Sequence, residues 1–430
     1  MKRLIIFLCV ITLCMLNLNI TVYAQDDLEL YSNYYLLIDR DNGQVIFEDG
    51  SDEKIYPASM TKIMTLLIAV EEIKDMSETV VLDSVIFENL YEENASMAGY
   101  YLDEVVSLQD CVYGLFLPSG AETTRAVATY VAGSEDAFVE LMNQKAEELG
   151  MSNTHFVNTT GLHDADHYTT LNDLAVLLEY SLQNKAFQEI FYTREYVSTS
   201  GSYHSSGLSW ESTMFSAIDN IGWQDLDESA ILGGKTGYTN PAGLCLASVA
   251  SLDGRNYMLI TALAPVTGTS YHAIDAVNTY SEIYTEYVKE EWFNPEQSLG
   301  EIELNYKWFQ DTIAYYPQEV IALTLPNDVS SDEIQIISDV PETIDAPIEL
   351  NQVLGSVQVI YEEEVIYQFN VVSNEQIERS NVLYYTDVIM TWIMNHLVIS
   401  IVSFSIIIAV LWLAYIKWIR EKRLGYRRLY

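Results

Sequence analysis

A serine and a lysine three positions apart are the first residues in this chain that could do chemistry. Ser59 and Lys62 lie in the stretch PASMTK at residues 57–62, and in a helix they would share one face. A serine hydroxyl becomes a useful nucleophile when a base takes its proton, and a buried lysine serves as that base once its amine is neutral. The same spacing is common on exposed helices, so the pair alone does not identify a site.

Two further motifs follow in the chain. Ser119 lies in LPSG, at a turn after an apolar stretch, and Lys235 begins KTGY, which leads into an apolar strand. Lys235 and Thr236 offer a cation and a hydroxyl donor to a substrate carboxylate, and Gly237 lets the backbone approach closely. Three short motifs in this order and at this spacing form a strong joint signal.

Helices and strands that could position these motifs are predicted from the apolar periodicity. Alternating residues around the turns DNG and DG predict two hairpins, formed by residues 34–39 with 44–48 and by residues 244–250 with 257–264. Helical spacing marks residues 59–73, 137–149 and 270–289, and Gly150 would end the second of these helices. Because strands and helices do not alternate regularly, an α+β fold is favoured over a parallel doubly wound sheet.

The composition changes near Asn294. Short runs rich in Val, Ile and Tyr then continue to about residue 375, at residues 320–325, 333–337, 354–361 and 365–372. They predict a separate β-sandwich-like module, and residues 376–396 would link it to the rest of the chain.

Both ends of the chain have the features of membrane signals. Lys2 and Arg3 precede the apolar run Leu4–Leu16, and the small residue Ala24 follows, which predicts a signal peptide over residues 1–24, with an uncleaved anchor as the alternative. Residues 397–416 contain no charge and are long enough to cross a membrane, and a basic tail follows over residues 417–430. The positive-inside rule places this tail in the cytoplasm and the body of a single-pass protein outside the cell membrane.

The overall charge and composition exclude two classes of protein. The 430 residues include 21 Lys and Arg against 62 Asp and Glu, which leaves too little basic surface for nucleic-acid binding. The 31 Tyr, 13 Phe and 7 Trp supply more apolar surface than disordered acidic chains have. Outside the predicted signal peptide only Cys111 and Cys245 remain, and we expect buried free thiols, with one disulfide bridge as the alternative.

With its three motifs, the chain resembles the serine D-alanyl-D-alanine carboxypeptidases, also called low-molecular-weight penicillin-binding proteins. The resemblance spans about residues 30–375, and includes the loop from Gly161 to Thr170 and the segments API and GSV at residues 346–348 and 355–357. It implies a catalytic domain like the DD-peptidases and serine β-lactamases over residues 28–293, followed by a β-rich domain over residues 296–375. Members of this family remove the last D-alanine from peptidoglycan stem pentapeptides through an acyl-enzyme, and penicillins acylate the same serine.

The resemblance also implies roles for the catalytic residues. Ser59 would be the nucleophile and Lys62 its general base, while Ser119 would pass the proton to the departing D-alanine. Backbone N–H groups of Ser59 and Tyr238 would form the oxyanion hole. We expect no metal and no cofactor.

For substrate binding, the resemblance implies that Lys235 and Thr236 hold the terminal carboxylate, beside Gly237 and Tyr238. This chain departs from the family in two places. Its second motif has Ala121 where the family usually has an asparagine, which removes an amide next to the base lysine. A carboxylate-binding arginine of well-known members is replaced, by rough alignment, by Tyr271-His272.

Three rival functions were compared with this hypothesis. A class A β-lactamase needs a glutamate that activates water, and Tyr168 stands where that acid would be. The string HDADH at residues 163–167 resembles a metal cluster, but it coincides with the loop expected from the serine family. A penicillin-sensing or wall-binding homologue that has lost turnover is the alternative that Ala121 supports best.

Overall fold

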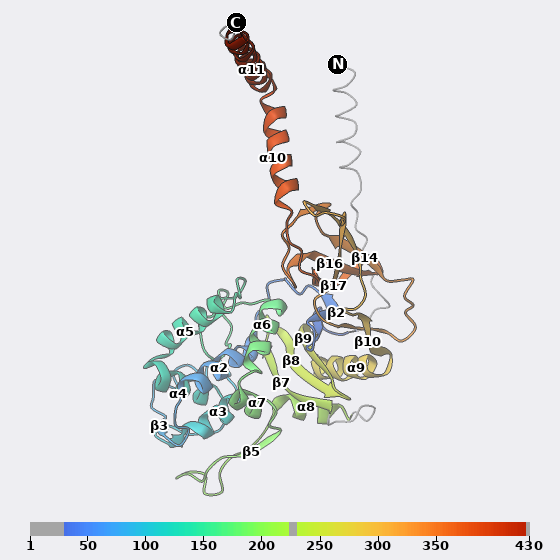
Figure 1. Cartoon of the computed structure of the whole chain (residues 1–430). Coiled ribbons are helices and arrows are strands. Elements are labelled where there is room, and N and C mark those ends of the chain that lie inside the picture. The colour runs from blue at the N-terminus through green and yellow to red at the C-terminus, as the bar shows by residue number, and fades with distance from the viewer. Residues whose placement is uncertain (1–29, 223–229, 427–430) are drawn as a thin grey trace, which may run out of the picture. The chain divides into compact units, whose positions relative to one another are not determined.

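The computed structural model describes residues 30–222 and 230–426 of the chain (Figure 1). It forms two compact units. The first contains the described residues up to Glu290 together with Ala322–Ile334 and Tyr361–Ile366, and the second contains Glu291–Ile321, Gln335–Ile360 and the chain from Tyr367 onward. The domain boundaries expected from the sequence stay a prediction, and the expected signal peptide lies outside the described residues.

A five-stranded antiparallel sheet lies at the centre of the first unit, in the order β2-β1-β9-β8-β7. Its strands are β1 (Tyr34–Asp39), β2 (Gln44–Asp49), β7 (Ile231–Thr239), β8 (Gly243–Leu252) and β9 (Arg255–Ala264). Both predicted hairpins are confirmed, as β1 with β2 and as β8 with β9. The KTGY motif lies on β7, which is an edge strand of this sheet.

Apolar side chains cover both faces of the sheet because successive residues of a strand point to opposite sides. Leu36 packs into the larger apolar cluster with the helices around α2 (Lys62–Glu72), whereas its neighbour Leu37 packs into a second cluster with α8 (Thr213–Ile221) and α9 (Tyr271–Thr285). The same alternation places Ala247 in the first cluster and Leu246 in the second. The sheet is therefore enclosed by an apolar cluster on each face.

Several helices of the first unit begin where the sequence supplies a capping side chain. Ser107 accepts a hydrogen bond from Asp110 N at 3.0 Å, and Ser134 accepts one from Ala137 N at 3.1 Å. The helices are α2 (Lys62–Glu72), α3 (Leu108–Phe116), α4 (Ala121–Ala132), α5 (Glu135–Glu148), α6 (Leu171–Ser181), α7 (Lys185–Phe191), α8 (Thr213–Ile221) and α9 (Tyr271–Thr285). Short strand pairs join them: β3 (Thr79–Val81) with β4 (Val105–Ser107), and β5 (Glu195–Val197) with β6 (Ser209–Glu211).

Two predicted helices have different limits from those expected. The segment at residues 59–73 begins as a 3-10 turn, η1 (Ala58–Thr61), and becomes α-helical only from Lys62. The helix expected over residues 270–289 ends at Thr285, and β10 (Tyr287–Phe293) follows. The residues after Thr285 are not helical because they form β10, which pairs with β13 (Ile321–Pro326). Local periodicity does not reveal this distant partner.

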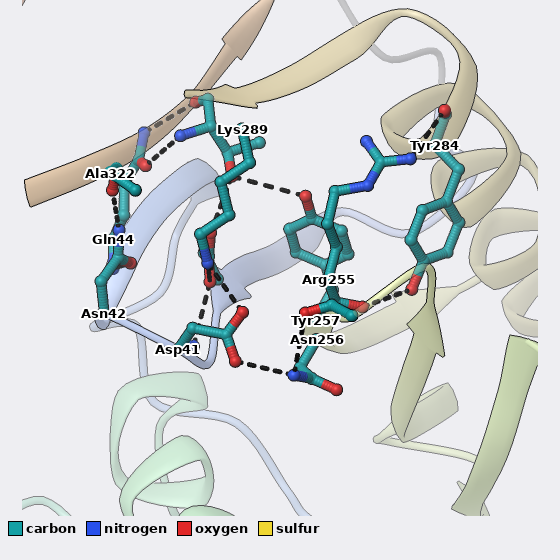
Figure 2. Close-up of polar contacts among 12 residues, drawn as sticks. Asp41, Asn42, Gln44, Arg255, Asn256, Tyr257, Tyr284, Lys289 and Ala322 are labelled. Carbon is teal, nitrogen blue, oxygen red and sulfur yellow. Dashed lines mark hydrogen bonds and ion pairs between the residues drawn. The ribbon is translucent and has the colours of Figure 1, made fainter. Parts of the chain in front are cut away.

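Polar contacts join residues 322–324 to the β1–β2 turn within the first unit (Figure 2). Gln44 accepts a hydrogen bond from Thr324 N at 2.8 Å and donates one to Thr324 O at 2.9 Å. Lys289 Nζ lies 2.9 Å from the buried Asp39 and 2.7 Å from Asp41. These contacts explain why a segment expected in the β-rich module groups with the first unit.

Most of a six-stranded sheet, in the order β14-β16-β17-β12-β11-β15, belongs to the second unit. Its strands are β11 (Gly300–Asn305), β12 (Thr312–Pro317), β14 (Gln335–Asp339), β15 (Thr343–Asp345), β16 (Val353–Tyr361) and β17 (Glu364–Val372). Most of the segment expected as a linker is helical, as α10 (Asn381–Asn395), and α11 (Leu397–Tyr426) follows it. Within α11, Leu397–Arg420 is long and apolar enough to cross a membrane, with a mean hydropathy of 2.8 and none of its most apolar window buried.

Candidate active site

Ser59 and Lys62 lie where the 3-10 turn η1 passes into α2. The Ser59 side chain is partly accessible, whereas Lys62 is only 2% exposed. Lys62 Nζ donates hydrogen bonds to Ser59 Oγ at 3.1 Å and to the backbone carbonyl of Thr160 at 2.5 Å. The sequence spacing thus produces a direct contact between the hydroxyl and the amine, as general-base activation of a serine requires.

The surroundings of Lys62 favour the neutral amine. Burial lowers the pKa of Lys62 to about 7, while the negative charges of Glu122 and Glu135 act in the opposite direction. Near neutral pH a large fraction of this side chain is therefore unprotonated. An ordinary surface lysine would be almost fully charged at that pH and unable to accept a proton.

The carbonyl that Lys62 contacts belongs to a loop organised by Asn158. Asn158 Oδ1 accepts hydrogen bonds from Thr160 N at 3.2 Å and from Gly161 N at 2.7 Å. Gly161 has φ +83°, and a β-carbon there would overlap the carbonyl of Ala58. This loop therefore lies directly against the turn that carries the serine, and only glycine permits that approach.

Ser119 lies between α3 and α4 in a left-handed conformation, with φ +63°. Its side chain is 4% exposed, and its hydroxyl has no hydrogen-bond partner among the described residues. Gly120 N bonds to the carbonyl of Gly114 at 2.9 Å and Ala121 N to that of Ser96 at 2.8 Å, which holds the turn in place. A strained residue with an unsatisfied hydroxyl at this position is typical of a functional site.

The KTGY motif borders the same space from the edge strand β7. Thr236 Oγ1 donates a hydrogen bond to Thr213 Oγ1 at 2.6 Å. A β-carbon on Gly237 would lie 2.9 Å from the carbonyl of Pro57 and 3.3 Å from Ser59 N, so β7 runs close beside the serine turn. The free edge of such a strand can accept an extended peptide as an additional strand.

Lys235 is placed differently from the rest of its motif. It is 1% exposed, and its Nζ donates to the carbonyl of Thr236 at 3.0 Å and lies 5.9 Å from the ring centre of Phe116. Burial, with a smaller effect of the Lys62 charge, places the pKa of Lys235 well below its ordinary value. The amine of Lys235 is thus buried in the wall of the site and does not border the open space.

These elements enclose a cavity of about 940 Å³. Of the seven residues proposed from the sequence for catalysis and substrate binding, six border it: Ser59, Lys62, Ser119, Thr236, Gly237 and Tyr238. Tyr238 is 48% exposed at the rim. Three chain segments far apart in sequence thus meet at one cavity, and Ala121 borders it without an amide to offer.

Several groups at the site were missed by the sequence analysis. Thr160 contributes through its backbone carbonyl and Thr213 through its contact with Thr236, so neither forms a recognisable motif. Glu122 is completely buried, and its Oε1 accepts a hydrogen bond from Gly99 N at 2.8 Å. Only the neighbouring Ser119 motif could have drawn attention to Glu122, because a buried glutamate in a helix has no signature of its own.

Two residues behind the rival enzyme functions, His167 and Tyr168, do not border the cavity. His167 is buried, with Nε2 2.7 Å from Thr61 Oγ1 and Nδ1 accepting a hydrogen bond from Val157 N at 3.2 Å. Both of its ring nitrogens are therefore engaged by the protein. Tyr168, at the position of the β-lactamase glutamate, lies beneath the ammonium of Lys54, 3.6 Å from its ring centre, and does not border the cavity.

The two cysteines outside the predicted signal peptide do not form a disulfide. Cys111 and Cys245 are both buried and free, as expected, and burial raises the pKa of each. They act as small apolar groups in the core.

Sequence comparison agrees with this arrangement. Residues 20–264 match the D-alanyl-D-alanine carboxypeptidase family of peptidases, and residues 294–379 match the C-terminal domain of penicillin-binding protein 5. The D-alanyl-D-alanine carboxypeptidase DacF of Bacillus subtilis is 26% identical over 354 residues, which cover 80% of this chain and 85% of DacF. DacA of Escherichia coli is 26% identical over 380 residues, covering 85% of this chain and 88% of DacA.

Solved structures share the fold. Penicillin-binding protein 5 from Haemophilus influenzae superposes with a TM-score of 0.63 over 82% of this chain and 98% of that chain, at 19% identity. Together the family match, which covers more than half of the chain, and the shared α+β and β-rich architecture lead to one conclusion. The chain belongs to the D-alanyl-D-alanine carboxypeptidase family of peptidases.

Proposed function

We propose that this protein is a serine-type D-alanyl-D-alanine carboxypeptidase that removes the terminal D-alanine of peptidoglycan stem pentapeptides. The observation that carries the proposal is the contact of 3.1 Å between Lys62 Nζ and Ser59 Oγ, made by a buried amine whose pKa is lowered to about 7. The pair borders a cavity beside the edge strand β7, where an extended peptide fits.

In the first half of the reaction, Ser59 Oγ attacks the carbonyl carbon of the penultimate D-alanine, and Lys62 takes the hydroxyl proton. The backbone N–H groups of Ser59 and Tyr238 would stabilise the negative oxygen of the tetrahedral intermediate. The bond to the terminal D-alanine then breaks. Its nitrogen receives a proton through Ser119, whose buried hydroxyl has no other partner among the described residues.

In the second half, water replaces the departed D-alanine and attacks the ester carbonyl, and Lys62 again accepts a proton. This step restores the Ser59 hydroxyl and releases the shortened peptide. Thr236 would bind the substrate carboxylate directly, and Lys235 lies in the wall behind it, where an approaching carboxylate would favour the charged form of its amine. Penicillins would acylate Ser59 by the same attack.

We also propose that α11 anchors the protein in the bacterial cell membrane as a single span. Its apolar segment is unburied and is followed by basic residues, which favour a cytoplasmic C-terminus. The catalytic unit would then lie outside the membrane, where peptidoglycan stem peptides are found. The helix supports anchoring, and the orientation follows from the charge asymmetry.

The test is D-alanine release from a stem pentapeptide by the full chain in detergent. We expect release by the wild type and loss of at least about a thousandfold in Ser59→Ala, because the nucleophile is removed. Ser77→Ala, at an exposed serine outside the cavity, is the matched control and should retain full activity. Release by Ser59→Ala at the wild-type rate would contradict the proposal.

A second candidate, a penicillin-sensing or wall-binding homologue without turnover, is favoured by Ala121. This side chain borders the cavity where an asparagine amide would otherwise contact the base and the substrate. Acylation of Ser59 by a penicillin without any D-alanine release would favour this candidate over the carboxypeptidase.

A further inference from the structure

His272 is a cavity residue that the mechanism above does not use. It is the second residue of α9 and borders the same cavity as Ser59 and Thr236. The side chain is only 6% exposed, and its Nδ1 atom has no hydrogen-bond partner among the described residues. A buried polar atom without a hydrogen-bond partner destabilises the folded protein. Such an atom beside a cavity therefore points to a ligand that supplies the missing partner.

The start of α9 adds a second favourable feature for an anion. The Ser270 side chain makes no capping hydrogen bond among the described groups, and the first turn has no acidic residue. The positive end of this 15-residue helix is therefore not neutralised locally by its own sequence. His272 projects from that end, and Lys235 does not border the cavity, so His272 is the more direct contact for an anionic group.

We propose that His272 recognises the terminal carboxylate of the substrate, and that carboxylate binding is coupled to protonation of its imidazole. This inference rests on the proposed function, and it assigns a specificity-determining residue to that reaction. In the free enzyme the ring is neutral near pH 7, because burial lowers the pKa of His272 to about 4. A carboxylate in contact would favour the charged form and raise that pKa, so binding should strengthen as the pH falls.

Few other charged groups lie around His272 in the described structure, and their effects can be distinguished from that of His272 by experiment. Asp275, on the same helix, is engaged by the side chain and backbone N–H of Ser32 at 2.6 and 2.9 Å. The neighbouring helix α8 borders the cavity with Thr213 and Ala217, which do not titrate. Lys62 and Glu93 also border the cavity and Lys235 lies in its wall, and all three remain unchanged in a His272 variant.

The experiment compares benzylpenicillin with its methyl ester as acylating agents of Ser59 in the full chain. The two compounds differ in one carboxylate, and both need Lys62, so the ratio of their acylation rate constants cancels the titration of the base. We expect the acid-to-ester ratio of the wild type to rise severalfold between about pH 7.5 and about pH 5.5. In His272→Gln the ratio should fall about tenfold at the lower pH and depend less on pH.

Controls separate recognition from general disturbance of the fold. His163→Gln makes the same change at an exposed histidine on another wall of the cavity, and it should leave the ratio unchanged. His272→Asn is a second variant, in case glutamine prevents folding, and thermal unfolding verifies both proteins. Equal losses with acid and ester in the His272 variants would overturn the inference, because a merely structural role affects both compounds alike.

A binding measurement keeps the inference separate from the proposed function. If wild-type Ser59 reacts with neither compound, the acyl-transfer proposal fails, and the histidine is then judged by affinity alone. Acetylated D-alanyl-D-alanine should bind the wild type about tenfold more tightly than its C-terminal amide, and His272→Gln should remove most of that difference. Equal affinities of the wild type for the two dipeptides would overturn the role of His272.

Discussion

At the scale of single residues, Lys62 shows how opposing electrostatic effects set a working pKa. Burial favours the neutral amine, while the buried carboxylate of Glu122 and the partly buried one of Glu135 favour the charged form. The result is a pKa of about 7. With a much higher pKa the amine would stay charged and accept no proton, and with a much lower pKa it would be too weak a base to take one. Glu122 therefore belongs to the machinery, although it does not border the cavity.

Activity should depend on pH through Lys62. Because the neutral amine is the base, acylation of Ser59 should fall about tenfold for each pH unit well below 7. Glu122→Gln removes a negative charge that raises the pKa of Lys62, so the acidic limb of the profile should move to lower pH. The measurement is the rate at which the methyl ester of benzylpenicillin acylates Ser59 across about pH 5 to 9. This compound has no carboxylate that could shift the pKa of nearby groups.

Glutamine is a close match for Glu122, because its carbonyl can still accept the hydrogen bond from Gly99 N. Glu140→Gln removes the same charge from an exposed position on α5 and should leave the limb in place. A limb that stays fixed in Glu122→Gln, or that moves to higher pH, would show that this carboxylate does not act on the base.

Residues with a distinctive chemistry and fixed spacing could be predicted from the sequence alone. Ser59, Lys62 and Ser119 were identified in this way, and the structure brings them to one cavity. Thr160 could not be, because it acts through a backbone carbonyl that every residue type possesses. The burial of Lys235 in the wall could not be predicted from the sequence either. A motif gives the identity of a side chain and not the direction in which it points.

At the scale of elements, the site depends on the close packing of a loop against the serine turn. Gly161 has φ +83° and leaves no room for a β-carbon next to the carbonyl of Ala58. A side chain at this position would have to displace η1, and the Ser59 hydroxyl with it. The loop therefore fixes the nucleophile by steric exclusion as well as through the contact of Thr160 with Lys62.

Gly161→Ala should consequently reduce both stability and acylation. Gly133 offers a matched control, because it also has φ +83° but nothing lies within 4 Å of an added β-carbon. Gly133→Ala should cost about 1 kcal/mol for its backbone alone and lower Tm by about 3 °C. Gly161→Ala should lower Tm at least about twice as far and slow acylation of Ser59 at least about tenfold. Equal Tm values and unchanged acylation in the two variants would contradict the steric argument.

Elements with local signals were predicted well, and those that depend on distant partners were not. The hairpin of β8 and β9 has its turn in the sequence and was found with nearly correct limits. The expected helix over residues 270–289 was too long, because β10 becomes a strand only through its pairing with β13. Likewise, the residues of α10 were expected to be a linker. They form a helix with apolar residues at helical spacing, and α11 begins directly after His396.

At the scale of the whole molecule, the chain combines a strongly acidic composition with one long apolar helix. The 62 acidic residues against 21 basic ones favour a soluble body that repels other anionic surfaces. The apolar segment Leu397–Arg420 has none of its most apolar window buried, so nothing in the described protein covers it. Leaving such a surface in water costs free energy in proportion to its apolar area, so we expect this helix to lie in a lipid bilayer.

Removal of this helix should therefore change the location of the protein and leave its chemistry intact. We expect the full chain to stay in the membrane fraction during an alkaline carbonate wash, because a spanning helix is held by burial of its whole apolar length. A chain that ends at His396 should appear in the soluble fraction and acylate Ser59 within about twofold of the full-length rate, since His272 is the last residue along the chain that borders the cavity. Extraction of the full chain by carbonate would instead indicate attachment at the membrane surface, and a large loss of acylation would mean that α11 supports the fold of the catalytic unit.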